Sequence, residues 1–256
     1  MHKPLNINFT KMHGLGNDFM VVDATAHSIS FDAALIQKLS QRHLGIGFDQ
    51  LLLIGKSNRA DFSCRFFNAD GSEAEQCGNG VRCVARFLHE HKMLTQNTLQ
   101  LDTKAGVISL LIHDYAHIQV NMGSPKIENV DLPGVIAVSM GNPHAILLVD
   151  SIKQISLDET GKKYASHPAF PQGVNVGFME IANRKHIRLR TYERGVGETC
   201  ACGSNACAAV VAGIQVGQLD NKVIVELAYG NLEIELDKNG QVLMTGPAEN
   251  VFIGKL

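Results

Sequence analysis

Two cysteines are the clearest chemical signal in this chain, because each lies in the same short motif and the motifs are 125 residues apart. Cys77 is followed by Gly-Asn-Gly and Cys202 by Gly-Ser-Asn. A glutamate stands four residues before each cysteine, Glu73 in the first motif and Glu198 in the second. Two thiols facing one carbon suit a reaction that removes a proton from one face and returns it on the other. The repeat therefore predicts proton-transfer chemistry at a site built from two halves.

Several polar residues share the same offset. It relates Gly16-Asn17 to Gly141-Asn142, Gln50 to Asn175, and Asn68 to Glu193. Each amide alone is typical of an ordinary turn, but their matched positions favour contacts with a substrate. His144 is either a pH-active partner for a sulfur or a surface imidazole, and we favour the first interpretation.

The segment after each cysteine is expected to begin a helix. A helix N-terminus presents unpaired N–H groups and a partial positive charge, which favour a thiolate and a bound carboxylate. The amides of Gly78-Asn79 and Gly203-Ser204 are therefore candidates for holding a substrate carboxylate. Arg194, in a glycine-flanked turn, is either a two-point clamp on a carboxylate or a solvated loop arginine.

The other cysteines have a simpler interpretation. We expect Cys64, Cys83, Cys200 and Cys207 to be buried, unreactive thiols. A zinc site is not indicated, because the sequence has no C-x-x-C pair and the C-x-C at 200–202 lacks histidines at ligand spacing.

Composition excludes several classes of protein. The chain has 256 residues, 45% of them hydrophobic and 19% charged, with a net charge of −2 and no basic block, so nothing favours nucleic-acid binding. No apolar run approaches the ~20 residues that a membrane span needs. Residues 1–6 lack the apolar core of a signal peptide. We therefore expect a cytoplasmic protein with reduced cysteines.

The sequence pattern predicts an α+β fold with two similar domains from an internal duplication. Each should be a mixed, largely antiparallel sheet curled around a central helix, with the active site in the cleft between them. The expected domains are 1–115 and 116–246, with 247–256 as a candidate addition to the first. Helices are predicted over 31–42, with Ser30 as N-cap and Gly45 past its end, over 78–91, and over an enclosed 203–216. Alternating apolar residues predict strands near 62–66, 99–101, 223–225 and 232–236.

The chain resembles a diaminopimelate epimerase over nearly its whole length. The motifs that carry the resemblance stand in order at 11–19, 47–50, 67–72, 77–80, 141–144, 193–199 and 246–248. The resemblance implies interconversion of LL- and meso-diaminopimelate in lysine and peptidoglycan precursor synthesis. It also implies no pyridoxal phosphate, metal or other cofactor, a small-molecule substrate, and commonly a homodimer.

The resemblance also implies roles for individual residues. Cys77 and Cys202 match the paired acid and base, and His144 and Glu193 match residues that tune the thiols. The anion cradle corresponds to Gly78, Asn79, Gly203 and Ser204. The substrate-binding set corresponds to Asn17, Gln50, Asn68, Asn142, Asn175, Glu193 and Arg194.

Two positions depart from the family pattern. Asn205 stands where a small residue, often glycine, is usual, and it puts the geometry of the second helix end in question. Phe252 stands where a tyrosine often contributes to the dimer contact, and it leaves the strength of a dimer open.

Two alternatives remain open on the sequence alone. Another cofactor-independent racemase, such as a proline or hydroxyproline epimerase, would use the same two-thiol plan. It would not need Arg194 and five amides for the far end of a longer substrate. A non-catalytic amino-acid-binding protein would keep the arginine clamp but have no use for two matched thiols.

Overall fold

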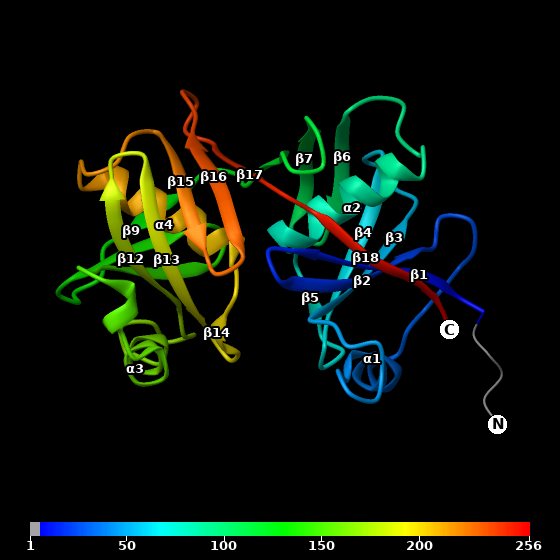
Figure 1. The fold of residues 1–256 in the computed structure, drawn as a ribbon, viewed down its shortest axis with the longest axis horizontal. Helices are drawn as coiled ribbons and strands as arrows, with labels where there is room; N and C mark the ends of the chain where they lie inside the picture. The colour runs from blue at the N-terminus through cyan, green and yellow to red at the C-terminus, as the bar shows by residue number, and fades with distance from the viewer. Residues whose placement is uncertain (1–5) are drawn as a thin grey trace. The chain divides into compact units, whose positions relative to one another are not determined.

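The computed structural model describes residues 6–256. The segment 1–6, in which we expected no signal peptide, lies outside the described residues except for Asn6. The chain divides into two compact units (Figure 1). Unit 1 contains the described residues up to Val120 together with Pro247–Leu256, and unit 2 contains Asn121–Gly246. Unit 1 runs past residue 115 because the strand Ile118–Asn121 pairs with its neighbour Gly106–Ile112.

Unit 1 is a sheet with two helices. Its helices are α1 (Ala33–Ser40) and α2 (Gly78–Glu90). Its strands are β1 (Asn8–Gly14), β2 (Asn17–Asp23), β3 (Gln50–Gly55), β4 (Phe62–Asn68), β5 (Glu73–Ala74), β6 (Thr98–Thr103), β7 (Gly106–Ile112), β8 (Ile118–Asn121) and β18 (Glu249–Lys255). In Figure 1 the red β18 lies beside the blue β1, with which it pairs.

Unit 2 has the same kinds of element. Its helices are α4 (Gly203–Gln215), the short α3 (Lys162–Ala165), the π-helical turn η2 (Leu157–Gly161) and the 3-10 turn η1 (Ile152–Gln154). Its strands are β9 (Lys126–Glu128), β10 (Val135–Ser139), β11 (Pro143–Leu148), β12 (Asn175–Asn183), β13 (His186–Glu193), β14 (Gly197–Thr199), β15 (Lys222–Leu227), β16 (Gly230–Leu236) and β17 (Val242–Gly246).

The two units pair their strands in the same order and direction. In unit 1 the pairs β2–β3 and β4–β6 are parallel and the others antiparallel. In unit 2 the corresponding pairs β11–β12 and β13–β15 are parallel and the others antiparallel. Even the register matches: Leu52 pairs with Phe66 in unit 1, and Gly177 pairs with Thr191, 125 residues later, in unit 2. The fold is therefore the expected pair of similar mixed-sheet domains.

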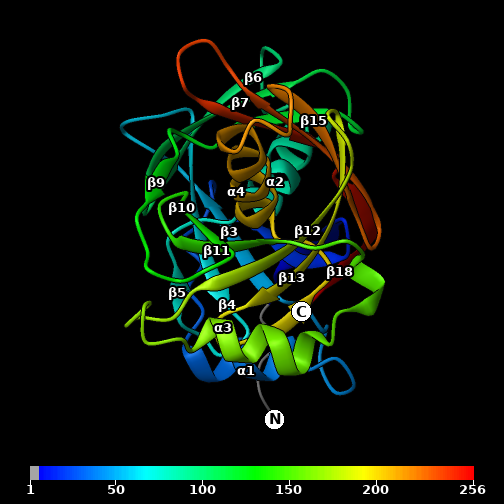
Figure 2. The same ribbon diagram turned by 90° about the vertical axis from the view of Figure 1, so that its left-hand side faces the viewer.

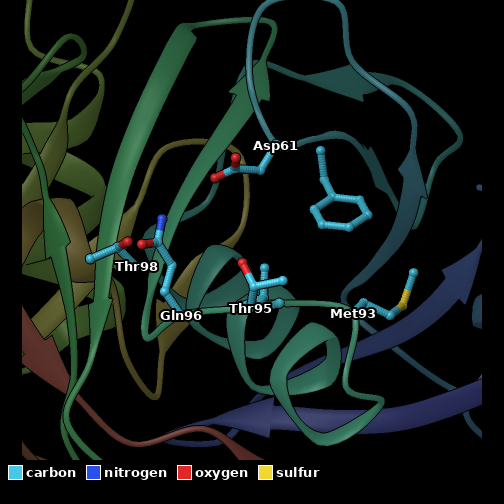
Figure 3. Close-up of a pocket in the computed structure, with 7 residues that line it drawn as sticks. Asp61, Met93, Thr95, Gln96 and Thr98 are labelled. Atoms are coloured by element: carbon cyan, nitrogen blue, oxygen red, sulfur yellow. The ribbon is translucent and has the colours of Figure 1, made fainter.

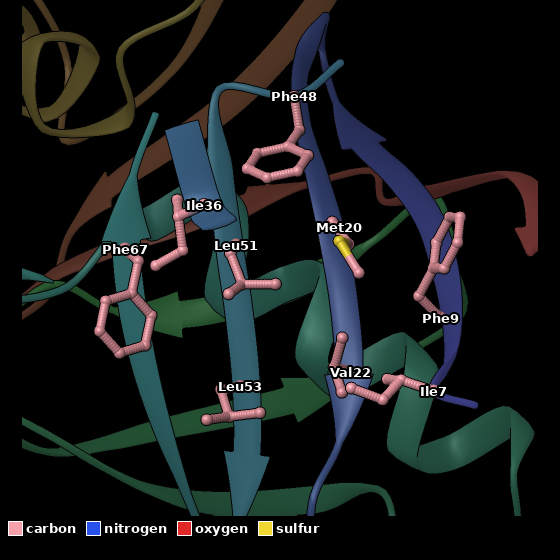
Figure 4. Packing of buried hydrophobic residues seen from close by; sticks show 9 residues of the cluster. All are labelled: Ile7, Phe9, Met20, Val22, Ile36, Phe48, Leu51, Leu53 and Phe67. Atoms are coloured by element: carbon pink, nitrogen blue, oxygen red, sulfur yellow. The ribbon is translucent and has the colours of Figure 1, made fainter. Parts of the chain in front are cut away.

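Each sheet buries both of its faces, because one face packs on the long helix and the other on shorter elements. In unit 1 the face away from α2 forms a cluster with α1 and the loop before β3 (Figure 4). Its members are Ile7, Phe9, Met20, Val22, Ile36, Phe48, Leu51, Leu53 and Phe67. In unit 2 helix α4 contacts strands from β10 to β17, and Figure 2 shows β11 and β12 beside it. Burial on almost every side explains its apolar sequence.

The predicted long helices are present within one residue at each end. The first helix is shorter than predicted, and its N-cap is Asp32, whose side chain accepts a 2.7 Å hydrogen bond from the Leu35 N–H. Ser30 was the wrong cap, because Asp32 is the residue directly before the first helical turn. Residues 157–165 form a helical segment that the sequence pattern did not predict.

Candidate active site

Each cysteine of the repeat is the N-cap residue of the long helix in its unit. Cys77 has extended backbone angles (φ −143°, ψ 118°) directly before α2, and Cys202 has similar angles (φ −119°, ψ 109°) before α4. The carbonyl of each cysteine accepts the first helical hydrogen bond, from Val81 and Ala206 respectively. Each sulfur therefore lies at a helix end where N–H groups and the helix dipole favour an anion.

In unit 1 the sulfur of Cys77 lies against the amide of Asn17. The thiol donates to Asn17 Oδ1 over 3.5 Å, and Asn79 Nδ2 donates to the same oxygen over 3.3 Å. The Asn17 amide is held from its other end, where Nδ2 donates to Asp49 Oδ2 over 2.8 Å. These contacts bring the predicted residues Cys77, Asn17 and Asn79 together and fix which way the Asn17 amide points.

A charged network behind Asn17 was not predicted from the sequence. Asp18 accepts from Lys11 over 2.6 Å and from both terminal nitrogens of Arg42, which also reaches Asp49 Oδ1 at 2.7 Å. Burial favours the protonated acid, but hydrogen bonds from Arg42 and Lys11 outweigh it and lower the pKa of Asp18. Asp18 and Asp49 each adjoin a predicted site residue, and that adjacency was the only available signal.

A fully buried arginine supports the same helix end. Arg82 donates to Asn79 Oδ1 over 2.9 Å, to the Gly78 carbonyl over 3.2 Å and to the Pro247 carbonyl over 3.1 Å. An arginine one turn into a helix would ordinarily be assigned to its exposed face. Its position here fixes the Asn79 side chain and ties α2 to the start of the C-terminal segment.

Gln50 and Asn68 are cross-strand partners at the start of β3 and the end of β4. Gln50 Nε2 donates to Asn68 Oδ1 over 2.8 Å, and Asn68 Nδ2 donates to Ser72 Oγ over 3.0 Å. The buried Gln50 Oε1 has no hydrogen-bond partner among residues 6–256. The structure thus places these two predicted amides together.

In unit 2 the surroundings of Cys202 differ. Burial raises its pKa well above the ordinary value, the nearby Glu193 carboxylate raises it further, and hydrogen bonds from Ser204 and the Asn205 backbone oppose both. These effects disfavour the thiolate that we expected at this helix end. Glu193 itself accepts a 2.6 Å hydrogen bond from the Thr199 hydroxyl.

His144 is not the surface imidazole that one interpretation allowed, since only 1% of it is exposed. Burial lowers its pKa to about 3, which favours a neutral ring near pH 7, and the role that we favoured, as a partner for a sulfur, stays a prediction. Its Nε2 lies 3.0 Å from Asn142 Oδ1.

Asn175 and Arg194 meet at the end of the β12–β13 pair. Asn175 Oδ1 accepts from the Arg194 N–H over 2.9 Å, and the guanidinium donates to the Gln172 carbonyl over 2.6 Å. Arg194 is exposed but packs so closely on Gly173 (φ +72°) that a Cβ there would lie 2.7 Å from its side chain. Two neighbouring contacts therefore hold this exposed arginine in place.

Three of the remaining cysteines are buried as predicted: Cys64, Cys83 and Cys207. Burial raises the pKa of Cys64 and raises that of Cys83 to about 12, which makes both thiols unreactive. Cys200 is exposed, contrary to prediction, because it lies in the loop between β14 and α4.

The two departures from the family pattern have distinct surroundings. Asn205 is fully buried in the first turn of α4, and its Oδ1 would lie 2.3 Å from a Cβ added at Gly177. Phe252, on β18, is 47% exposed and packs edge-on against Phe9, with ring centroids 6.0 Å apart.

A shallow pocket in unit 1 lies away from Cys77 (Figure 3). It is lined by Asp61, Phe62, Met93, Leu94, Thr95, Gln96 and Thr98. Most of these residues follow the C-terminal end of α2, roughly 20 Å along the helix from its N-cap.

Within residues 6–256 no cluster of histidine, cysteine and acidic side chains could hold a metal ion. No helix in this part of the chain is long and apolar enough to cross a membrane.

Comparison with known proteins identifies the family to which the sequence belongs. The family model described as diaminopimelate epimerase matches residues 9–128 and 136–251. A protein of Nitrosomonas europaea named diaminopimelate epimerase is 46% identical, with 98% of this chain and 99% of that one covered. One of the same name from Acinetobacter baumannii is also 46% identical, with 98% and 97% covered.

Solved structures share the fold at much lower identity. A PhzF-family phenazine biosynthesis protein from Bacillus anthracis has a TM-score of 0.77 at 17% identity, with 98% of this chain and 99% of that one covered. A hydroxyproline epimerase from Agrobacterium vitis, with bound trans-4-hydroxy-L-proline, has a TM-score of 0.73 at 15% identity, with 100% and 94% covered. At these identities the likeness concerns the fold alone.

Proposed function

Because the chain belongs to the diaminopimelate epimerase family, we propose that it interconverts LL- and meso-diaminopimelate with Cys77 and Cys202 as the two bases. One observation carries the assignment of the bases. The two cysteines are the N-cap residues of equivalent helices in two units with the same strand pairing. A duplicated frame that repeats a thiol at the same position supports a reaction with equivalent groups on two faces of one carbon.

The proposed reaction is a balanced proton transfer. A thiolate removes the α-proton, and the C–H electron pair is delocalised into the adjacent carboxylate. The opposite thiol then donates its proton to the other face, which inverts the centre without oxidation or reduction. The mechanism requires both sulfurs to reach the same carbon, and it draws on no cofactor.

Helix ends are proposed to stabilise the developing charge. Backbone N–H groups of Gly78-Asn79 and Gly203-Ser204 would bind the carboxylate next to the reacting carbon. The carbanion is far less stable than a thiolate, so this preorganised positive potential must lower its energy. Exclusion of water by bound substrate would strengthen the same interactions.

The remaining predicted residues would bind the other polar groups of the substrate. We assign this role to Asn17, Gln50 and Asn68 in unit 1 and to Asn142, Asn175, Glu193 and Arg194 in unit 2. Glu193 would also tune the acidity of Cys202, because the Glu193 carboxylate raises the pKa of that thiol. His144 would act through Asn142, with which it shares a hydrogen bond, and not through its own titration.

The wider setting follows from the proposed activity. The two units would be the duplicated halves of one enzyme, which acts in the cytoplasm on a precursor of lysine and peptidoglycan. A homodimer, without nucleic-acid or membrane partners, is the proposed assembly. The exposed Val251, Phe252 and Ile253 on β18 are consistent with such a contact.

Solvent-deuterium incorporation tests the function. Purified enzyme is incubated with LL-diaminopimelate in deuterated water, and the substrate and product are followed by mass spectrometry and chiral chromatography. We expect one deuterium at the inverted α-carbon and formation of the meso isomer, without added cofactor and in the presence of a chelator. Turnover of proline or hydroxyproline instead would overturn the substrate assignment, and loss of activity with the chelator would overturn the mechanism.

A further inference from the structure

The orientation of the Asn17 amide in unit 1 is decided by the groups at the two ends of a short hydrogen-bonded chain. An asparagine side chain has a donor NH₂ group and an acceptor oxygen, so its orientation follows from what each end meets. At one end of the chain the Asp49 carboxylate, which only accepts, lies 2.8 Å from Asn17 Nδ2. At the other end the Arg82 guanidinium, which only donates, lies 2.9 Å from Asn79 Oδ1. The two asparagines lie between these charges.

The two charges favour one arrangement of both amides. Because Arg82 binds the Asn79 oxygen, the Asn79 NH₂ group is left to donate to Asn17 Oδ1, over 3.3 Å. Because Asp49 binds the Asn17 NH₂ group, the Asn17 oxygen is turned towards the donors on the other side. Reversing either amide would set donor against donor or acceptor against acceptor. The sulfur of Cys77, 3.5 Å from the Asn17 oxygen, therefore faces an acceptor and not a donor.

The Asp49 carboxylate is itself held by three donors. Its Oδ1 accepts from Arg42 Nη2 over 2.7 Å, and its Oδ2 accepts from the Asp18 N–H over 3.1 Å as well as from Asn17. The Asp49 N–H in turn lies 3.0 Å from the Asp18 carbonyl and 2.9 Å from Asp18 Oδ1. A side chain that carries donors of its own could not replace this carboxylate without losing at least one of the three hydrogen bonds.

The duplicated frame does not require a carboxylate at this position. The offset of 125 residues relates Asp49 to Val174 and Arg82 to Cys207, so the equivalents of both charged ends are uncharged in unit 2. Val174 is fully buried directly before β12, just as Asp49 directly precedes β3. An apolar residue therefore serves the same place in the fold. What Asp49 adds in unit 1 is its hydrogen bonding towards Asn17 and the network behind it.

We propose that Asp49 is a positioning residue for Cys77, because its carboxylate turns the Asn17 oxygen towards the sulfur and so holds the S–H group in a hydrogen bond. The thiol hydrogen, which otherwise rotates about the Cβ–Sγ bond, is then directed at one defined atom. A sulfur held in this way needs less reorientation when the reaction begins. The effect on turnover rests on the proposed role of Cys77 in epimerisation, whereas the S–H contact does not.

Infrared spectroscopy of the S–H stretch tests the contact without substrate. The band of Cys77 is isolated as the difference between the spectra of the wild type and of Cys77→Ala. A thiol that donates to an oxygen absorbs at a lower frequency than a free thiol, so we expect the Cys77 band at the lower frequency. A Cys77 band at the free-thiol frequency, or no Cys77 band near pH 7, would overturn the proposal.

Two variants then separate positioning from a merely structural role. Asp49→Asn keeps the shape but sets an NH₂ group among three donors, and Asp49→Val introduces the residue type that unit 2 has at the equivalent place, so at least one should fold. We expect the Cys77 band to move towards the free-thiol frequency in both variants. Asp102→Asn is the matched control, because this carboxylate of unit 1 also pairs with an arginine, Arg59, and accepts from Ser57. It should leave the band unchanged.

Kinetics connect the contact to the reaction. We expect kcat for diaminopimelate to fall about tenfold in both Asp49 variants, as for one lost hydrogen bond, with a smaller rise in KM through Asn17. A higher KM with unchanged kcat would confine Asp49 to substrate binding and refute its role towards Cys77. An unmoved Cys77 band in a folded Asp49 variant would refute the proposal even if the enzyme were slower. If the wild type did not turn over diaminopimelate, the proposed function would fail, and the infrared result would still decide the contact.

Discussion

The two units use the same backbone frame but give the equivalent asparagines, Asn17 and Asn142, different partners. In unit 1 the Asn17 NH₂ group is bound by Asp49, and its oxygen lies against the Cys77 thiol. In unit 2 the oxygen of the equivalent Asn142 is bound by His144. A duplication therefore preserved strand order and helix position, while the side chains behind the site diverged.

The helices show the same divergence. The buried Arg82 of α2 organises Asn79 and two backbone carbonyls, whereas its equivalent in α4 is the small, buried Cys207. Unit 1 thus has a satisfied charged network behind its cysteine. In unit 2 the Glu193 carboxylate lies near Cys202, and the buried His144 Nδ1, Thr191 Oγ1 and side-chain atoms of Asn205 are uncharged and lack partners in the described chain. The difference indicates that unit 1 depends more on single polar side chains for its stability.

The first prediction tests whether both cysteines are needed for epimerisation. Replacing Cys77 or Cys202 by alanine should lower epimerisation at least about 100-fold in both directions, because each direction needs a base on one face and an acid on the other. Rates from LL- and from meso-diaminopimelate measure this. Cys207→Ala, a buried thiol in the same helix as Cys202, is the control. A Cys77→Ala enzyme that kept one direction would contradict the equivalence of the two halves.

The second prediction concerns the two helices. Arg82→Met should lower the free energy of unfolding by about 3 kcal/mol, because it leaves buried acceptors unsatisfied. The equivalent Cys207→Ala should cost only about 1 kcal/mol, since it removes one small group. Urea unfolding followed by circular dichroism measures both. Equal losses would remove the claimed difference between the units.

The third prediction tests whether unit 2 holds the far end of the substrate. Arg194→Lys should weaken binding of diaminopimelate by roughly 1.5–3 kcal/mol, because a planar two-point clamp becomes a point charge. The dissociation constants of diaminopimelate for the two proteins give this difference in binding free energy. Arg184→Lys, an exposed arginine of the same unit paired with Asp220, should leave binding unchanged. An unchanged affinity in Arg194→Lys would return that residue to the class of surface arginines.

The smallest expected effect concerns pH and distinguishes His144 from its apolar equivalent Phe19. The folded-state pKa of His144 is about 3, below the ordinary 6.5, so the unfolded chain binds a proton that the folded one rejects. Its contribution to stability is therefore present above pH 6.5 and is lost as the pH falls towards 3. The wild type should lose about 1 kcal/mol more than His144→Gln between pH 6.5 and 5.5. Parallel stability curves for the two proteins would contradict a buried, neutral imidazole.

Much of the frame could be predicted from the sequence, because hydrophobic periodicity and the cysteine repeat are local signals. The helices that follow Cys77 and Cys202 and the strands around Phe66 and Ile234 lie where the pattern placed them. The cap at Asp32 was missed because Ser30 is an equally good capping residue by type.

Side-chain networks were not predictable, since they depend on long-range register. The pairing of Asn17 with Asp49 and of Arg82 with Pro247 joins residues far apart in the sequence. The exposure of Cys200 and the burial of His144 likewise follow from tertiary packing. Residue type alone offers several states for each of these side chains. The sequence therefore predicted where the helices and strands lie better than how these side chains are held.

The place of β18 has a consequence for how the protein is made. This strand is the neighbour of β1 in unit 1, and Arg82 and Arg86 of α2 donate to the carbonyls of Pro247 and Ala248 just before it. Translation delivers these residues only after the whole of unit 2. Unit 1 must therefore wait, with an open edge on β1, while unit 2 can fold as soon as it emerges. The half that begins first is the half that is completed last, so chaperones that shield nascent chains would meet β1 for most of synthesis.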